Sequence, residues 1–151
     1  MVERFAQAGV NGMSDRIFVD TNILIYAHDR DAGEKYRTAA AIVEGLWTAR
    51  TGVVSTQVLQ EFYVNITKKI PTPLSRAMAA DLVRGFLAWR VVTVTPSIIL
   101  KAFEIEKRSQ ISFWDSMIVS AALKANSTKI LSEDLKAGQE IAGMMIENPL
   151  A

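Results

Sequence analysis

Short apolar segments alternate with amphipathic segments along nearly the whole chain, and this alternation limits the possible folds. The apolar segments are 17–20, 53–54, 90–94 and 129–131, with 144–147 as a fifth candidate. They are rich in β-branched residues and apolar throughout, which is typical of strands buried on both faces of a parallel sheet. Between them, apolar residues recur with the period of a helix. We therefore expect an α/β protein with a central parallel sheet of four to five short strands covered by helices on both faces.

The boundaries of the expected helices follow from capping and breaking residues. Pro71 and Pro73 end one helix, and Ser112 is positioned to cap another. The length of 151 residues suits one domain, which we assign to residues 15–151, and we interpret residues 1–14 as a loose N-terminal extension. The expected helices are 23–28, 34–50, 56–70, 74–88, 97–109 and 113–124.

The chain contains no Cys and one His, which excludes several classes of site. Disulfide frameworks, zinc knuckles, iron–sulfur clusters and thiol nucleophiles need Cys, and a two-histidine zinc motif needs a second His. A metal site must therefore be built mainly from oxygen ligands, which suit Mg²⁺ or Mn²⁺. No apolar run approaches the roughly 18 residues of a membrane-spanning helix, and no secretory signal is evident, so we expect a cytoplasmic protein without a membrane partner.

The charges nearly cancel, with 17 Lys and Arg against 16 Asp and Glu, for a net charge of +1. Such a chain is not basic overall, so contacts with a nucleic acid would require basic residues that are grouped locally. Candidates in loops or at helix ends near the expected site are Arg30, Lys35, Arg37, Lys68, Lys69, Lys107 and Arg108.

Four acidic residues are placed where a parallel α/β sheet binds its ligands, beyond the carboxyl ends of the strands. Asp20 ends the first strand and Asp134 follows the fourth, while Glu61 and Asp115 lie in early turns of two helices. Converging carboxylates repel and raise one another's pKa values unless a divalent cation neutralises them. The cation would lower the pKa of a bound water and neutralise charge on a phosphate, while a carboxylate accepts the proton of the water. These positions predict phosphodiester hydrolysis, provided that the carboxylate oxygens can reach a common cation at about 2.0–2.2 Å.

Each of these acids also has a structural explanation. Asp115 follows Ser112 by three positions, as in a capping box, and Asp20 could cap the helix that follows it. Asp134 lies in a turn, and Glu61 alone is typical of a solvated helix position. Only their combined placement favours a site.

Other conspicuous residues have structural explanations as well. We expect Phe113 and Trp114 to lie in the core and His28 to lie in a loop or at the surface. Lys68 and Lys69 are typical of a solvated helix end, where they favour the helix dipole.

These segments resemble PIN-domain nucleases, and especially the toxins of VapBC-type toxin–antitoxin pairs. The resemblance covers residues 16–150, although the first strand of the family usually starts the chain. The matching segments are 17–22 (IFVDTN), 54–61 with Ser55, Val58 and Glu61, 113–122 (FWDSMIVSAA), 131–138 (LSEDLKAG) and 146–149 (IENP).

The resemblance implies an α/β/α sandwich and an endoribonuclease that depends on Mg²⁺ or Mn²⁺. By position, the family's acidic cluster corresponds to Asp20, Glu61, Asp115 and Asp134, and Asn22 corresponds to a polar residue that orients the first aspartate. It also implies a homodimer and a cognate antitoxin whose C-terminal segment crosses the active site. Supporting positions near the site are Ser55 and Ser132, with Glu133 as a fifth acid.

Three alternatives remain open. The chain could be a PIN-like module that binds RNA or a protein without cleaving it, although all four acidic positions are filled. It could be a DNA or flap-type nuclease with the same metal chemistry. A Rossmann-type nucleotide enzyme is disfavoured, because no GxGxxG or GxxxxGK motif occurs.

Overall fold

The computed structural model describes residues 15–151, and the extension expected at 1–14 lies outside them. In this part of the chain one sheet of six strands has the order β3-β2-β1-β4-β6-β5. Neighbouring strands are parallel except β5, which is antiparallel to β6. The strands are β1 (Ile17–Val19), β2 (Gly52–Ser55), β3 (Arg90–Val92), β4 (Lys129–Leu131), β5 (Glu140–Ile141) and β6 (Met144–Glu147).

The expected number of strands was too low by one, because β5 was not predicted. This strand has only two residues and therefore shows no periodicity. It pairs with β6 through a tight turn in which Ala142 and Gly143 have φ values of 51° and 83°. Positive φ at both central residues is the requirement of a type I′ hairpin turn.

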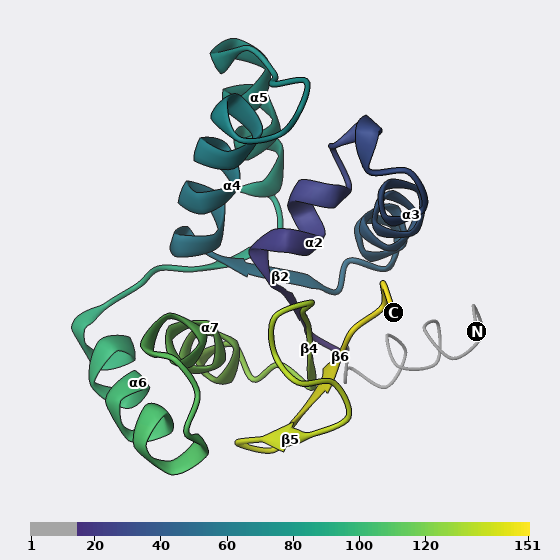
Figure 1. Ribbon diagram of the computed structural model, residues 1–151. Coiled ribbons are helices and arrows are strands. Elements are labelled where there is room, and N and C mark those ends of the chain that lie inside the picture. The colour runs from purple at the N-terminus through teal and green to yellow at the C-terminus, as the bar shows by residue number, and fades with distance from the viewer. Residues whose placement is uncertain (1–14) are drawn as a thin grey trace.

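The helices cover both faces of the sheet, as expected. Figure 1 shows α2 to α5 on one side of the strands and α6 with α7 on the other, which makes an α/β/α sandwich. None of the helices formed by residues 15–151 is both long and apolar enough to span a membrane. The helices are α2 (Thr21–Tyr26), the short 3-10 helix η1 (Arg30–Ala32), α3 (Glu34–Ala49), α4 (Thr56–Lys68), α5 (Arg76–Phe86), α6 (Pro96–Ser109) and α7 (Phe113–Lys124).

Helix α7 is buried along most of its length, and its first turn carries Asp115. All of its residues from Ser116 to Ala122 are buried. A polar side chain at such a position needs a partner, and the hydroxyl of Ser120 donates to the backbone oxygen of Ile98 in α6 at 2.8 Å. This packing holds the N-terminal turn of α7, with Asp115, at the carboxyl edge of the sheet.

His28 is more buried than the sequence suggested. Its ring packs edge-on against Phe62 at 5.2 Å and Phe86 at 5.9 Å, measured between ring centroids. Its Nδ1 lies 2.8 Å from the backbone oxygen of Leu24. Burial lowers the pKa of His28, and the hydrogen bond to Leu24 opposes this shift. His28 lies in the turn after α2, as expected, and it is half-buried because this turn folds inward onto α4 and α5.

Gly52 begins β2 directly beneath the indole ring of Trp89, which yields our first prediction. A Cβ at position 52 would lie 2.6 Å from atoms of this buried ring. We expect Gly52→Ala to lower the free energy of unfolding by about 1–3 kcal/mol, since a rigid buried side chain must shift. Chemical denaturation measures this change.

Gly45→Ala is the matched control. Gly45 lies in α3, and a Cβ there would meet no atom within 4 Å. This change should leave stability unaltered or raise it by up to about 1 kcal/mol. Equal stability of the two variants would contradict the proposed contact with Trp89.

Candidate functional site

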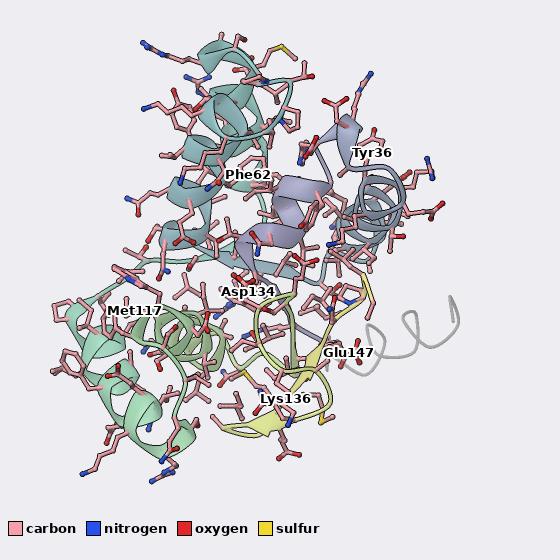
Figure 2. All side chains as sticks on the ribbon, in the orientation of Figure 1. Tyr36, Phe62, Met117, Asp134, Lys136 and Glu147 are labelled. Carbon is pink, nitrogen blue, oxygen red and sulfur yellow. The ribbon has the colours of Figure 1, made fainter. Side chains whose placement is uncertain are left out.

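The four predicted acids line one pocket at the carboxyl edge of the sheet. The pocket has a volume of about 470 Å³ and lies where β1, α4, α7 and the loop after β4 meet. Figure 2 labels Asp134 near the middle of the molecule, among the ends of these elements. Its acidic lining residues are Asp20, Glu61, Asp115 and Asp134.

Asp20 is the buried member of the group, with 5% of its surface exposed. It caps α2 by accepting from the backbone N–H of Thr21 at 2.7 Å, and it accepts from the hydroxyl of Ser132 at 2.8 Å. Its pKa is raised from 3.8 to about 6 in all: burial raises it most, the two hydrogen bonds oppose this rise, and the charges of Asp134 and Asp115 add to it. The capping explanation and the site explanation therefore both hold for this residue.

Asn22 holds Asp134 and not the first aspartate. Its side-chain Nδ2 lies 3.0 Å from both carboxylate oxygens of Asp134. The expectation that Asn22 orients Asp20 was wrong, because this position in the first turn of α2 faces the loop after β4. The pKa of Asp134 is raised, first by burial and then by the charges of Asp115 and Glu133, and the Asn22 amide lowers it.

Ser132 connects the loop after β4 to Asp20, as its predicted supporting position suggested. Its hydroxyl donates to Asp20 and accepts from the backbone N–H groups of Asp134 and Leu135, both at 3.1 Å. One fully buried side chain thus determines where the loop places Asp134 relative to Asp20.

Glu61 and Asp115 complete the pocket from two helices. The hydroxyl of Thr21 donates to Oε1 of Glu61 at 2.6 Å. Thr21 was missed as a site residue, and its only signal in the sequence is its position directly after Asp20. Ser112 caps α7 by accepting from the backbone N–H of Asp115 at 3.1 Å, so Asp115 has both the capping position and a place in the pocket.

Two predicted supporting residues do not contact the four acids. Ser55 is fully buried and caps α4 by accepting from the backbone N–H of Val58 at 3.2 Å. Glu133 accepts from Lys35 Nζ at 2.6 Å and from the Tyr26 hydroxyl at 3.0 Å. Glu133 is therefore an ionised carboxylate paired with Lys35 outside the pocket, and its charge raises the pKa of Asp134.

Of the basic candidates, only Lys69 lines the acidic pocket. Lys35 is paired with Glu133, and Arg37 is paired with Glu34 at 2.7 Å. Arg108 lines a different cavity, beside Ile141 and Ala142. Contacts of Arg30, Lys68 and Lys107 with a nucleic acid stay predictions.

Trp114 and Gln57 are further pocket residues that the sequence did not reveal. Trp114 was expected in the core, but 63% of its surface is exposed, because it stands on the outer side of the first turn of α7. The neighbouring Phe113 is partly buried and packs against the core. Gln57 is 9% exposed, and within residues 15–151 its Oε1 has no hydrogen-bond partner.

The chemistry of this donor set fits a hard divalent cation. Its carboxylates face one pocket, and the negative charges of Asp134 and Asp115 destabilise the ionised form of Asp20. In residues 15–151, however, no three acidic side chains stand so that they could hold one ion together, so the expected common reach of the carboxylates is not present in this arrangement. Asp20, Glu61 and Asp134 instead accept hydrogen bonds from Ser132, Thr21 and Asn22. Simultaneous binding therefore requires side-chain rotation, which the surface exposure of Asp134 permits.

The burial of Asp20 predicts how stability depends on pH. Its pKa is about 6 in the folded chain against 3.8 ordinarily, so its contribution to stability is complete below about pH 4 and is lost as the pH rises through 6. In a chelating buffer at about pH 8, Asp20→Asn should stabilise the fold by up to about 3 kcal/mol, at about 1.4 kcal/mol per pKa unit. Thermal unfolding at both pH values measures this.

The gain should shrink toward about pH 4, where Asp20 is protonated in both states. Glu44→Gln, at an exposed position of α3, is the control and should change stability little at either pH. A gain from Asp20→Asn that is equal at both pH values would contradict the electrostatic origin.

Three comparisons with known proteins place the chain. No curated protein sequence matches it. Among solved structures, the VapC20 toxin of Mycobacterium tuberculosis, described as cleaving the sarcin–ricin loop, is 23% identical, with a TM-score of 0.59 over 78% of this chain and 89% of that one. A toxin–antitoxin complex from Klebsiella pneumoniae is 18% identical, with a TM-score of 0.65 over 89% of this chain and 98% of that one.

DNA-bound VapBC from Salmonella typhimurium is also 18% identical, with a TM-score of 0.63 and coverage of 89% of this chain and 98% of that one. At these identities the likeness shows a shared fold. The sequence family described as the PIN domain matches residues 17–139, a range that includes all four acids of the pocket. The chain therefore belongs to the PIN domain family.

Proposed function

We propose that this protein is a metal-dependent endoribonuclease and the toxin of a toxin–antitoxin pair. The observation that carries the proposal is the pocket in which Asp20, Glu61, Asp115 and Asp134 come together at the ligand-binding edge of a PIN fold. Toxins from such pairs are among the proteins that share this fold. The cytoplasm, where RNA is available, is the expected location.

The four carboxylates would hold Mg²⁺ or Mn²⁺. When bound, the ion lowers the pKa of a water molecule and neutralises charge that develops on the phosphate. Thr21 and Asn22 position Glu61 and Asp134 through their hydrogen bonds. Lys69, on the wall of the same pocket, supplies a positive charge for the RNA backbone.

We propose that the antitoxin covers an apolar groove beside the acidic pocket. This groove lies between α4 and α5, has a volume of about 460 Å³ and is lined almost entirely by apolar surface. Gln60 and Val64 line both the groove and the acidic pocket, so one bound segment could occupy both. The other groove residues are Leu59, Tyr63, Ala80, Val83 and Arg84.

The expected homodimer also remains a proposal. Leu100 and Phe103 are 64% and 52% exposed and lie three positions apart on α6, so they share one face of that helix. Large apolar side chains that are exposed together favour an interface between subunits.

Replacement of single carboxylates tests the proposed reaction. Asp20→Asn and Asp115→Asn should each lower RNA cleavage by about 100-fold or more, since a ligand of the ion is worth several kcal/mol of barrier. Chelation should abolish cleavage, and Mg²⁺ or Mn²⁺ should restore it. Turnover of labelled single-stranded RNA measures the effect, with structured DNA as the competing substrate.

Asp81→Asn is the matched control, because Asp81 is an exposed carboxylate on α5 that pairs with Arg84 at 2.6 Å, outside the pocket. Its variant should cleave at the wild-type rate. Wild-type RNA cleavage by both Asp20→Asn and Asp115→Asn would contradict the proposal. RNA binding that persists under chelation without cleavage would instead indicate a non-catalytic module, and faster turnover of DNA would indicate a DNA nuclease.

A substitution in the groove separates antitoxin binding from cleavage. Val83→Asp should leave RNA cleavage unchanged and weaken inhibition by the cognate antitoxin at least about tenfold, since a charge is buried at an apolar contact. Leu87→Asp is the control, because Leu87 is an exposed apolar residue at the end of α5 outside the groove. Equal inhibition of both variants would place the antitoxin elsewhere.

A further inference from the structure

We propose that Trp114 is a platform on which an unpaired nucleobase stacks, beside the phosphate that the acidic pocket receives. This inference rests on the proposed ribonuclease function and specifies its substrate as a single-stranded segment. It starts from the position of Trp114, which directly precedes Asp115 in the first turn of α7 and lines the same pocket as Asp20 and Glu61.

The indole ring of Trp114 is exposed, and one of its sides packs against another aromatic ring. Its exposed fraction is 63%, the second largest among the exposed large apolar residues of the described chain. It packs edge-on against Phe113, with 5.2 Å between ring centroids and an angle of 70°. Phe113 in turn packs against Phe103 of α6 at 5.7 Å. This row of aromatic rings restrains Trp114 and leaves much of its surface open to a ligand.

The part of the pocket wall that α4 and Lys69 form is mostly polar and suits the edge of a base. It carries amide side chains and one ammonium group, from Gln57, Gln60, Asn65 and Lys69. Gln60 and Lys69 are the exposed members of this wall, whereas the Oε1 of Gln57 is buried and has no hydrogen-bond partner in the described chain. Exposed amide and ammonium groups can hydrogen-bond to the edge of a base while the face of the base contacts an indole ring.

Because the pocket is acidic, stacking of a base on Trp114 would add affinity for RNA that phosphate contacts alone do not supply. Among the described residues that line the pocket, Lys69 is the only basic one, so affinity must come partly from groups that do not contact phosphates. A nucleobase has an apolar face that stacks on an aromatic ring whatever its sequence. Bases within a duplex already stack on their neighbours, so only an unpaired base can present its face to Trp114.

Fluorescence and kinetics together test this role. The probe is a short single-stranded oligoadenylate, which is titrated into the protein in a buffer with Ca²⁺ in place of Mg²⁺ or Mn²⁺. The same strand paired to its complement is the comparison. The single strand should quench the tryptophan fluorescence of the wild type. Trp114→Phe should lose most of this quenching and keep most of the affinity, because Phe also stacks.

Trp114→Ala should weaken binding of the single strand by about 5- to 100-fold and raise KM much more than it changes kcat. Binding of the duplex should not change. Trp47→Phe is the control, since Trp47 is 40% exposed but packs on Phe86 and Trp89 outside the pocket. Its variant should bind RNA as the wild type does. Circular dichroism verifies that each variant folds.

Wild-type affinity of Trp114→Ala for the single strand would overturn the proposal. If that variant also became monomeric in a sedimentation experiment, a second copy of the chain would be the partner of Trp114. If the wild type cleaves RNA and Trp114→Ala changes neither RNA affinity nor KM, the ribonuclease function stands and the stacking role is wrong. Quenching and weakened binding without any cleavage support the stacking role and remove the ribonuclease function.

Discussion

The burial of the Asp20 carboxylate is the constraint on which the site depends. Asp20 must be reached by hydrogen-bond donors, because a charge at this depth is otherwise too unfavourable. The Ser132 hydroxyl and the Thr21 backbone supply them, and the same Ser132 oxygen orders the loop that carries Asp134. Even so, burial and the neighbouring carboxylates hold the pKa of Asp20 near 6. The fold thus maintains an unfavourable concentration of negative charge, which is what a cation-binding site requires.

Helix α7 shows how one element can serve both core and site. From Ser116 to Ala122 it is buried, and this part resembles a core helix with no polar face. Its first turn projects beyond the sheet and presents Asp115 and Trp114 to the pocket. The rigid packing of the buried part gives the exposed turn a defined position, which is the arrangement expected of functional groups carried on a scaffold. The apolar groove between α4 and α5 adjoins the pocket, because Gln60 and Val64 line both.

Much of the fold could be predicted from the local sequence pattern. The predictions that were wrong failed for physical reasons. The buried strands and the amphipathic helices carry their periodicity in the sequence, so their type and order were recovered. The two-residue strand β5 was missed because it has no periodicity and forms only by pairing with β6. Trp114 was assigned to the core because its apolar character does not reveal which side of the first turn it occupies. Asn22 was assigned to the wrong aspartate, because both acids lie near α2 and only the path of the loop after β4 decides between them.

The sequence by itself determined the α/β class, the exclusion of thiol chemistry and of zinc sites built from Cys or two His, and the four acidic positions, because these depend on composition and on residues close in the chain. Only the tertiary structure decided that these acids line one pocket, that Thr21, Asn22 and Ser132 are their partners, and that Glu133 pairs with Lys35 outside it. Several of these contacts join residues about 40 to more than 100 positions apart. Their geometry follows from sheet order and helix packing, which local sequence does not encode.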